Sequence, residues 1–413
     1  MPATRIAAML PRSTSGSPSS LMQQEFLPGR TRDVVPSVQP QQRAWLEIDG
    51  EAIRHNTAVL RSSLRPGCQL MAVVKADGYG HGAVTVAEAA LEGGASSFGV
   101  ATLAEGIELR QAGIEAPILV LGNLQQPEEF RCCLHWQLSP TISSLRQGLI
   151  GSNVAVAGGK PLLAHLKLDT GMARLGIDWE QGPKLLEELQ QLDGLKIAGV
   201  YSHLADADNP DGVLNAIQHQ RFEAVLRRFH ELELQPGLRH LANSAGTLSN
   251  PEFHYDMVRV GLALYGHTPA THLRQLPLQP AMSVHARVTL LRNVPAGAGV
   301  SYGHQFHTTR PSRLAVLGIG YADGVSRRLS GQMEVLAEGR RLPQVGAITM
   351  DQIVIDATDL PELEIGDAIT LLGSSGSETI GPEAWSHVCQ SIPWEVLCSF
   401  KHRLPRLPRR PEH

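Results

Sequence analysis

The sequence of 413 residues predicts an α/β protein: a closed (β/α)₈ barrel of the TIM type followed by a mostly-β C-terminal domain. Eight short apolar runs alternate with amphipathic stretches of helical spacing before Gly266. Polar residues follow several of these runs, and β-rich segments largely replace the helical spacing after Gly266. Apolar runs that alternate with helices indicate parallel strands joined by crossover connections.

The eight apolar runs are the expected barrel strands. They are Leu70–Val74, Ser97–Ala101, Pro117–Leu121, Leu138–Ile142, Leu163–Leu168, Ile197–Tyr201, His240–Ala242 and Met257–Val260. Eight strands within about 200 residues fit a single closed barrel.

Polar side chains lie within or just after five of these runs. They are Lys75, Lys167, Asp169, His203, Asn243, Ser244 and Arg259. Active sites of such barrels lie at the C-terminal ends of the strands. The sequence therefore predicts an active site that contains these residues.

The expected domain organisation has four parts. Residues 1–43 form an N-terminal extension, 44–275 the barrel, 276–406 the mostly-β domain and 407–413 a basic tail. The extension is rich in Ser and Pro, and has no acidic residue before Glu25. We expect it to be disordered; an organelle transit peptide is the less favoured alternative.

Composition excludes several classes of protein. The formal net charge of −4 provides no general basic field for nucleic acid or anionic membranes. No apolar run approaches the ~20 residues that span a bilayer. The five cysteines have no Cys-x-x-Cys spacing, which excludes a zinc ribbon and gives no support for a disulfide framework. We expect a reduced, cytoplasmic enzyme without a metal.

Lys75 is the residue with the clearest chemical potential. It lies in AVVKADGYGHG, where a buried run meets a glycine-rich loop. Burial lowers the pKa of a lysine, and its neutral amine can then form a Schiff base with an aldehyde cofactor or act as a base. Position alone favours the simpler alternative, a lysine that extends its amine into water.

The segment KADGYGHG resembles the pyridoxal 5′-phosphate lysine motif of the alanine racemases. Further matching motifs follow in the same order: HLKLDTGMARLG at 165–176, YSHLADAD at 201–208, HLANSAGT at 240–247, DMVRVGLALYG at 256–266, GVSYG at 299–303, IGYADGVSRR at 319–328, GAITMDQ at 346–352 and WEVLCSFKHRLPR at 394–406. The resemblance implies a homodimer that interconverts L- and D-alanine by a two-base mechanism and supplies D-alanine for peptidoglycan.

The resemblance also implies a role for each matching residue. Lys75 would hold the cofactor and serve as one base, and Tyr302 would be the second base, supplied by the other subunit. Arg259 would face the pyridine nitrogen, and His203 would bridge Arg259 and Tyr302. The phosphate would be bound by Tyr79, Asn243, Ser244 and the backbone amides of Gly261 and Leu262. From the residues alone, Asn243 and Ser244 are also good helix caps.

Substrate recognition would depend on residues from both domains. Arg174 and the Met350 backbone amide would bind the substrate carboxylate, and Tyr321 would restrict the entrance. Lys167 would support Arg174 as a carbamate; the alternative is that Asp169 neutralises Lys167.

Two positions depart from the family pattern. His402 replaces a frequent tyrosine, which leaves the phosphate contact there in question, and Thr349 replaces a frequent cysteine.

Four other functions compete with this interpretation. A racemase of broader amino-acid specificity needs only small changes in the substrate pocket. A decarboxylase of the same architecture would need a catalytic cysteine, which GAITMDQ lacks. A non-catalytic protein that binds the same cofactor would resemble the barrel alone, so residues 276–406 argue against it. A metal-dependent barrel hydrolase would need a histidine cluster, and the sequence has no His-x-His pair.

Overall fold

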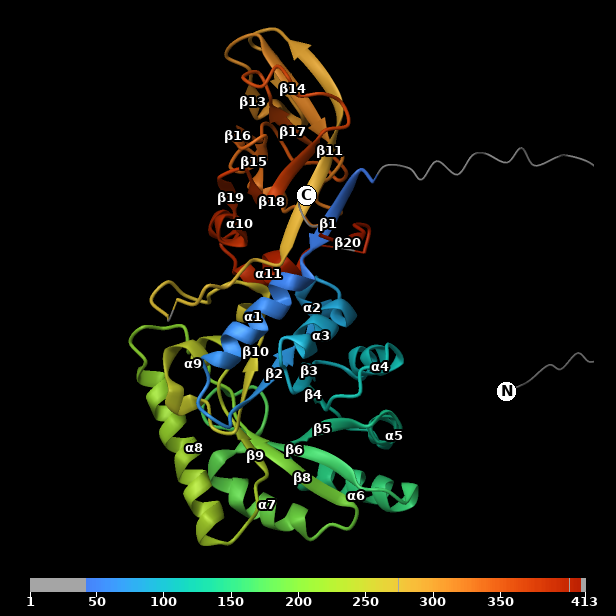
Figure 1. The fold of residues 1–413 in the computed structure, drawn as a ribbon, viewed down its shortest axis with the longest axis vertical. Helices are drawn as coiled ribbons and strands as arrows, with labels where there is room; N and C mark the ends of the chain where they lie inside the picture. The colour runs from blue at the N-terminus through green and yellow to red at the C-terminus, as the bar shows by residue number, and fades with distance from the viewer. Residues whose placement is uncertain (1–41, 274, 401, 410–413) are drawn as a thin grey trace, which may run out of the picture. The chain divides into compact units, whose positions relative to one another are not determined.

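The computed structural model describes residues 42–273, 275–400 and 402–409 (Figure 1). Eight parallel strands close into a barrel, because β10 pairs with both β9 and β2, and β5 pairs with β6. The strands are β2 (Gln69–Val73), β3 (Ser97–Val100), β4 (Ile118–Asn123), β5 (Leu138–Ile142), β6 (Leu162–Asp169), β8 (Leu195–Tyr201), β9 (Leu238–His240) and β10 (Met257–Val260). Each expected run overlaps one strand, which confirms the barrel prediction.

Helices precede or connect the barrel strands, as the amphipathic spacing predicted. They are α1 (Gly50–Ser62), α2 (Lys75–Tyr79), α3 (Ala83–Glu92), α4 (Leu103–Gln111), α5 (Pro127–Trp136), α6 (Leu145–Gly158), α7 (Gly182–Gln190), α8 (Val213–Glu231) and α9 (Ser244–Ser249). Local sequence fixes several starts: Asp49 caps α1 by accepting the Ala52 N–H at 2.9 Å, and Thr102 and Glu105 form a capping box on α4.

The C-terminal domain is built around one long strand, β11 (Met282–Val294). β11 pairs antiparallel with β14 (Ser312–Leu317) and β18 (Ala368–Ser375), and β14 also pairs with β17 (Ile353–Asp356). The remaining elements are β15 (Glu334–Ala337), β16 (Arg340–Pro343), β19 (Glu378–Ile380), the short pair β12 (Gly299–Val300) and β13 (Phe306–His307), and two helices that the sequence analysis did not predict, α10 (Pro382–Cys389) and α11 (Pro393–Cys398).

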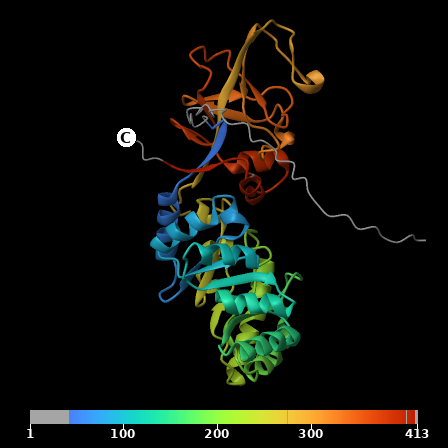
Figure 2. The same cartoon turned by 90° about the vertical axis from the view of Figure 1, so that its right-hand side faces the viewer.

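One strand that we did not predict falls within the range assigned to the barrel but belongs to the other sheet. β1 (Ala44–Ile48), which we had assigned to the barrel, pairs antiparallel with β11 and parallel with β20 (Arg406–Pro408) (Figures 1 and 2). Leu46 is fully buried in the core of the β domain. β20 includes residues 407 and 408, which we had assigned to the basic tail.

The expected N-terminal extension is only partly described. Residues 1–41 lie outside the described residues, and Arg43 forms an ion pair of 2.6 Å with the fully buried Asp323. None of the described helices is both long and apolar enough to cross a membrane.

Candidate active site

The turn that carries Lys75 has an uncommon backbone. β2 ends at Val73, and Lys75 opens the short helix α2. The next four residues, Ala76 to Tyr79, all have positive φ angles, between 52° and 58°. Only Gly78 adopts this left-handed conformation without cost, and each other residue type costs roughly 1–2 kcal/mol there. The backbone therefore turns sharply where the lysine leaves the strand.

Burial lowers the pKa of the Lys75 amine, and the positive charge of Arg174 lowers it further. The carboxylate of Glu105 acts in the opposite direction. Glu105 also fixes the backbone beside the lysine, because its Oε1 accepts the Ala76 N–H at 2.8 Å. The amine of Lys75 is consequently easier to deprotonate than that of an exposed lysine.

Arg259 is buried beneath the mouth of the barrel. Its Nη2 donates to the backbone oxygens of Ser202 (2.7 Å) and Leu241 (3.0 Å), and it lies 3.0 Å from His203 Nδ1. Burial lowers the pKa of Arg259 to about 10, so the guanidinium stays charged at neutral pH. His203 must then accept through Nδ1, which places its own proton on Nε2.

Lys167 is a second buried cation in this region. Its Nζ lies 5.1 Å from the centroid of the Tyr201 ring. Burial, with Arg259 and Arg174, lowers the pKa of Lys167 to about 8. Within the described residues Asp169 forms no ion pair with Lys167; its Oδ1 accepts backbone N–H groups of residues 171–173 instead. The charge of Asp169 still raises the pKa of Lys167, so Asp169 offsets part of the positive charge without pairing directly with it.

Lys75, Lys167, Arg174 and Arg259 together make the mouth of the barrel electropositive. Arg174 lowers the pKa of Lys75. Arg259, Arg174 and Lys75 lower the pKa of Lys167. No ion pair between any of these four and a carboxylate occurs in the described part of the chain. Such uncompensated charge suits an anionic ligand, and a phosphate or carboxylate would relieve the repulsion.

The residues expected to bind the phosphate also lie close together. The Ser244 Oγ accepts the N–H groups of Gly261 (3.0 Å) and Ala263 (3.3 Å). The hydroxyl of Tyr79 lies against Gly261, where an added Cβ would come within 2.5 Å of it. Any side chain at Gly261 would therefore displace Tyr79.

Asn243 and Leu262 flank this group. The Asn243 side chain accepts the Gly246 N–H at 2.9 Å, so it caps the N-terminus of α9, as the sequence analysis suggested. Leu262 begins the 3₁₀ turn Leu262–Tyr265 directly after Gly261.

Tyr302, Tyr321 and Met350 lie together in the C-terminal domain. They line a pocket of about 970 Å³ that no barrel residue lines. Tyr302 is 72% exposed. The Tyr321 N–H donates to Thr349 O at 2.9 Å, and no hydrogen bond of the Met350 N–H is found within the described residues. This amide is therefore available to an added carboxylate.

Within one chain, His203 contacts Arg259 but does not reach Tyr302, as the expected bridge between these two residues would require. No hydrogen bond joins Tyr302 to His203 in the described part of the chain. His402 is exposed and makes no described hydrogen bond to the residues expected around the phosphate. The Thr349 hydroxyl donates to Gln352 O at 2.8 Å, so this departure only stabilises its own turn.

Sequence reasoning missed residues that support the Lys75 turn. Glu105 was recognisable as the last residue of a Thr-x-x-Glu capping box, but its reach to Ala76 was not. Tyr265 and Arg406 contact the turn from distant parts of the sequence, Arg406 through Gly80 O at 2.8 Å. No local pattern signals such contacts.

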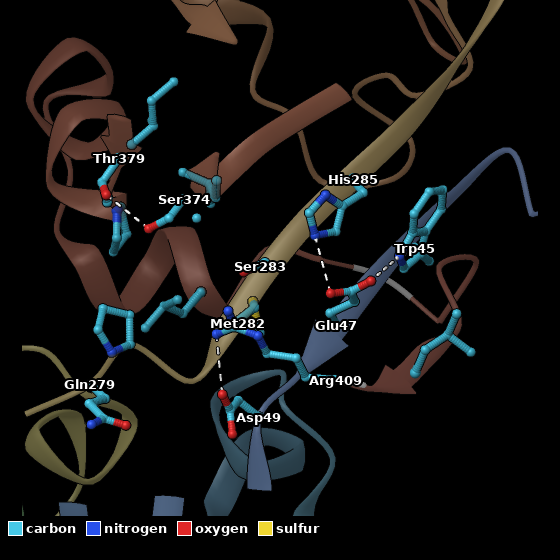
Figure 3. A pocket seen from close by; sticks show the side chains of 18 of the residues that line it. Trp45, Glu47, Asp49, Gln279, Met282, Ser283, His285, Ser374, Thr379 and Arg409 are labelled. Atoms are coloured by element: carbon cyan, nitrogen blue, oxygen red, sulfur yellow. Dashed lines mark hydrogen bonds and ion pairs between the residues drawn. The ribbon is translucent and has the colours of Figure 1, made fainter. Parts of the chain in front are cut away.

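A separate pocket of about 830 Å³ lies along β1 and β11 (Figure 3). It contains none of the residues expected in the active site. In it, Glu47 lies 3.7 Å from His285, and Asp49 lies 3.3 Å from Arg409.

The fold and the site define a barrel enzyme with a lysine at the mouth and a C-terminal β domain. Models of the alanine racemase N-terminal and C-terminal domains match residues 48–269 and 281–408. The chain belongs to the alanine racemase family.

Individual relatives agree with this assignment. An alanine racemase of Prochlorococcus marinus is 55% identical over 375 residues, which cover 90% of this chain and 97% of the relative. Among solved structures, alanine racemase from Bacillus anthracis with bound L-Ala-P has a TM-score of 0.83, 35% identity, and coverage of 90% and 96%. Alanine racemase from Bartonella henselae with covalently bound pyridoxal phosphate has a TM-score of 0.79, 34% identity, and coverage of 89% and 100%.

Proposed function

We propose that this chain interconverts L- and D-alanine with pyridoxal 5′-phosphate attached to Lys75. The observation that carries the proposal is the amine of Lys75, whose pKa is lowered by burial and by Arg174, within a group of cations that form no ion pair with a carboxylate in the described part of the chain. The same group explains why a phosphate-bearing cofactor and a carboxylate-bearing substrate would both bind here.

The residues at the barrel mouth fit the cofactor. The hydroxyls of Tyr79 and Ser244 and the Leu262 N–H offer hydrogen-bond donors for a phosphate, and Lys75 offers the amine for an aldehyde. When bound, pyridoxal phosphate supplies an electron-withdrawing ring that makes the α-proton of an amino acid acidic. Arg259 stays protonated, so it can only donate a hydrogen bond to the ring nitrogen. The ring would then withdraw electrons less strongly, which disfavours side reactions such as transamination.

Racemisation requires proton transfer at both faces of the α-carbon. Lys75 would take or give the proton at one face, and the Tyr302 hydroxyl at the other. The neutral His203 presents its Nε2 proton, which can bridge Arg259 to a tyrosine oxygen. Because one chain holds Tyr302 in a pocket without barrel residues, we propose that a second copy supplies it in a homodimer. Arg174 and the Met350 N–H would bind the carboxylate, and Tyr321 would narrow the entrance.

Chiral chromatography tests this function directly. Purified protein loaded with the cofactor should convert either enantiomer of alanine into an equal mixture of both. Incubation with a panel of other L-amino acids distinguishes an alanine enzyme from a racemase of broader specificity. Borohydride reduction followed by peptide mapping should place the cofactor on Lys75. Absence of racemisation, or a label on Lys167 or Lys160 instead, would contradict the proposal.

A further inference from the structure

The left-handed turn after Lys75 needs support from outside itself. Three of its four residues, Ala76, Asp77 and Tyr79, carry side chains that disfavour positive φ angles. Strained backbone of this kind persists only when the surrounding structure over-determines it. Contacts that hold the turn therefore also decide where the Lys75 side chain leaves the backbone.

Tyr265 contacts the chain on both sides of Lys75. Its hydroxyl donates to the Val73 backbone oxygen at 3.0 Å, two residues before the lysine. Its ring stacks on the Tyr79 ring, with centroids 4.8 Å apart and planes 22° apart, four residues after the lysine. Tyr265 is fully buried, so it cannot move away without opening the core.

His81 supports the same group. Its ring centroid lies 4.5 Å from that of Tyr265, and its Nδ1 lies 3.0 Å from the backbone oxygens of both Gly78 and Tyr79. Because both partners are acceptors, Nδ1 carries the proton and donates. Burial lowers the pKa of His81 to about 3, which keeps this ring neutral and its tautomer fixed.

We propose that Tyr265 is a positioning residue, which together with His81 clamps the left-handed turn and so directs the Lys75 amine into the barrel mouth. Tyr265 acts through Val73 and Tyr79. The consequence for turnover rests on the proposed racemase function, whereas the consequence for the Lys75 amine does not.

The variant Tyr265→Phe removes the hydroxyl and keeps the ring. In cofactor-free enzyme with ¹³C-methylated lysines, NMR titration reports the pKa of Lys75, whose signal is assigned by its loss in Lys75→Ala. The groups that act on this amine, Arg174, Glu105 and Cys398, are unchanged. We expect the pKa to move up toward the ordinary value of about 10.4, because the loosened turn admits water. In loaded enzyme, kcat/KM for alanine should fall by about 10- to 100-fold, as expected for a misplaced catalytic group.

Tyr255→Phe is the matched control. The Tyr255 hydroxyl also donates a hydrogen bond, to Glu223 at 2.6 Å, but Tyr255 precedes β10 at the opposite end of the barrel. This variant should keep both the wild-type pKa of Lys75 and the wild-type kcat/KM. If Tyr265→Phe also keeps both, the positioning role is refuted.

A second pair of variants covers the case in which Tyr265→Phe does not fold. His81→Asn keeps a donor near the turn carbonyls, and His81→Leu removes it. The pKa of Lys75 should rise more in His81→Leu than in His81→Asn; wild-type values in both would overturn the proposal. A wild-type protein that does not racemise alanine would reject the proposed function, while the titration would still decide the role of Tyr265.

Discussion

At the scale of single residues, the barrel mouth holds four positively charged side chains that form no ion pair with a carboxylate in the described part of the chain. Lys75, Arg259 and the pair Lys167 and Arg174 come from three different segments of the chain, and the fold brings their charges within range of one another. This repulsion destabilises the protein without ligand. A ligand that carries a phosphate or a carboxylate should therefore stabilise the fold more than an uncharged ligand of similar size.

The pH dependence of stability should reveal the cost of burying Lys167. Its pKa is about 8 in the folded state and about 10.4 when unfolded, so between these values only the unfolded chain holds the proton. Stability then rises with pH from about 8 to about 10.4, because the unfolded state binds more protons there. Below pH 8 the full penalty remains, at most about 3 kcal/mol.

Lys167→Met should therefore stabilise the cofactor-free protein at pH 7, and the gain should shrink as the pH approaches 10. Urea unfolding at several pH values, in buffers freed of carbon dioxide, measures this difference. Lys184, whose side chain is 81% exposed, provides the control, because Lys184→Met should show no such pH trend. Parallel curves for wild type and Lys167→Met would contradict the expectation.

At the scale of elements, β1 should matter to the β domain although it begins far from it in sequence. Leu46 is fully buried between β11 and β20, so Leu46→Ala should lower the free energy of unfolding by about 2–5 kcal/mol. Leu290→Ala, at a residue of β11 that is 44% exposed, should cost much less. Denaturant unfolding of both variants measures the contrast, and equal losses would mean that β1 contributes little.

Sequence patterns predicted the barrel because parallel strands covered on both faces are continuous apolar runs. They did not predict β1, because AWLEI is only five residues long and would suit either sheet. The helices α10 and α11 are also short, with eight and six residues, and give little periodic signal. For such elements only the completed tertiary packing decides the outcome.

The same contrast holds for the candidate site. Lys75, Lys167 and His203 were predictable because strand ends in a barrel converge on one face. Tyr265 and His81 were not singled out, because their contacts with the turn depend on where distant backbone atoms lie. Sequence periodicity contains no information about those atoms.

At the scale of the whole molecule, complementation tests whether Lys75 and Tyr302 of one active site come from different subunits. Mix Lys75→Ala and Tyr302→Phe, each inactive alone, under conditions in which subunits exchange. With equal amounts, about half of the dimers are mixed, and each mixed dimer has one site with both intact groups. Racemisation should then recover to roughly a quarter of the wild-type activity.

Subunit exchange must be confirmed independently, for example with two affinity tags. If exchange occurs and no activity returns, both groups act within one chain, and the shared site is wrong. Each variant incubated alone provides the baseline.

The pairing of β1 with β20 has a consequence for synthesis on the ribosome. The strand Ala44–Ile48 emerges early, but its two neighbours end at Val294 and Pro408. At a synthesis rate of 5–20 residues per second, β20 follows β1 by roughly 20–70 s. All eight barrel strands have been synthesised by Val260, well before that moment. During this interval the edge of β1 that will pair with β20 has no partner strand, so we expect nascent chains to be more prone to pair with one another until β20 has been translated.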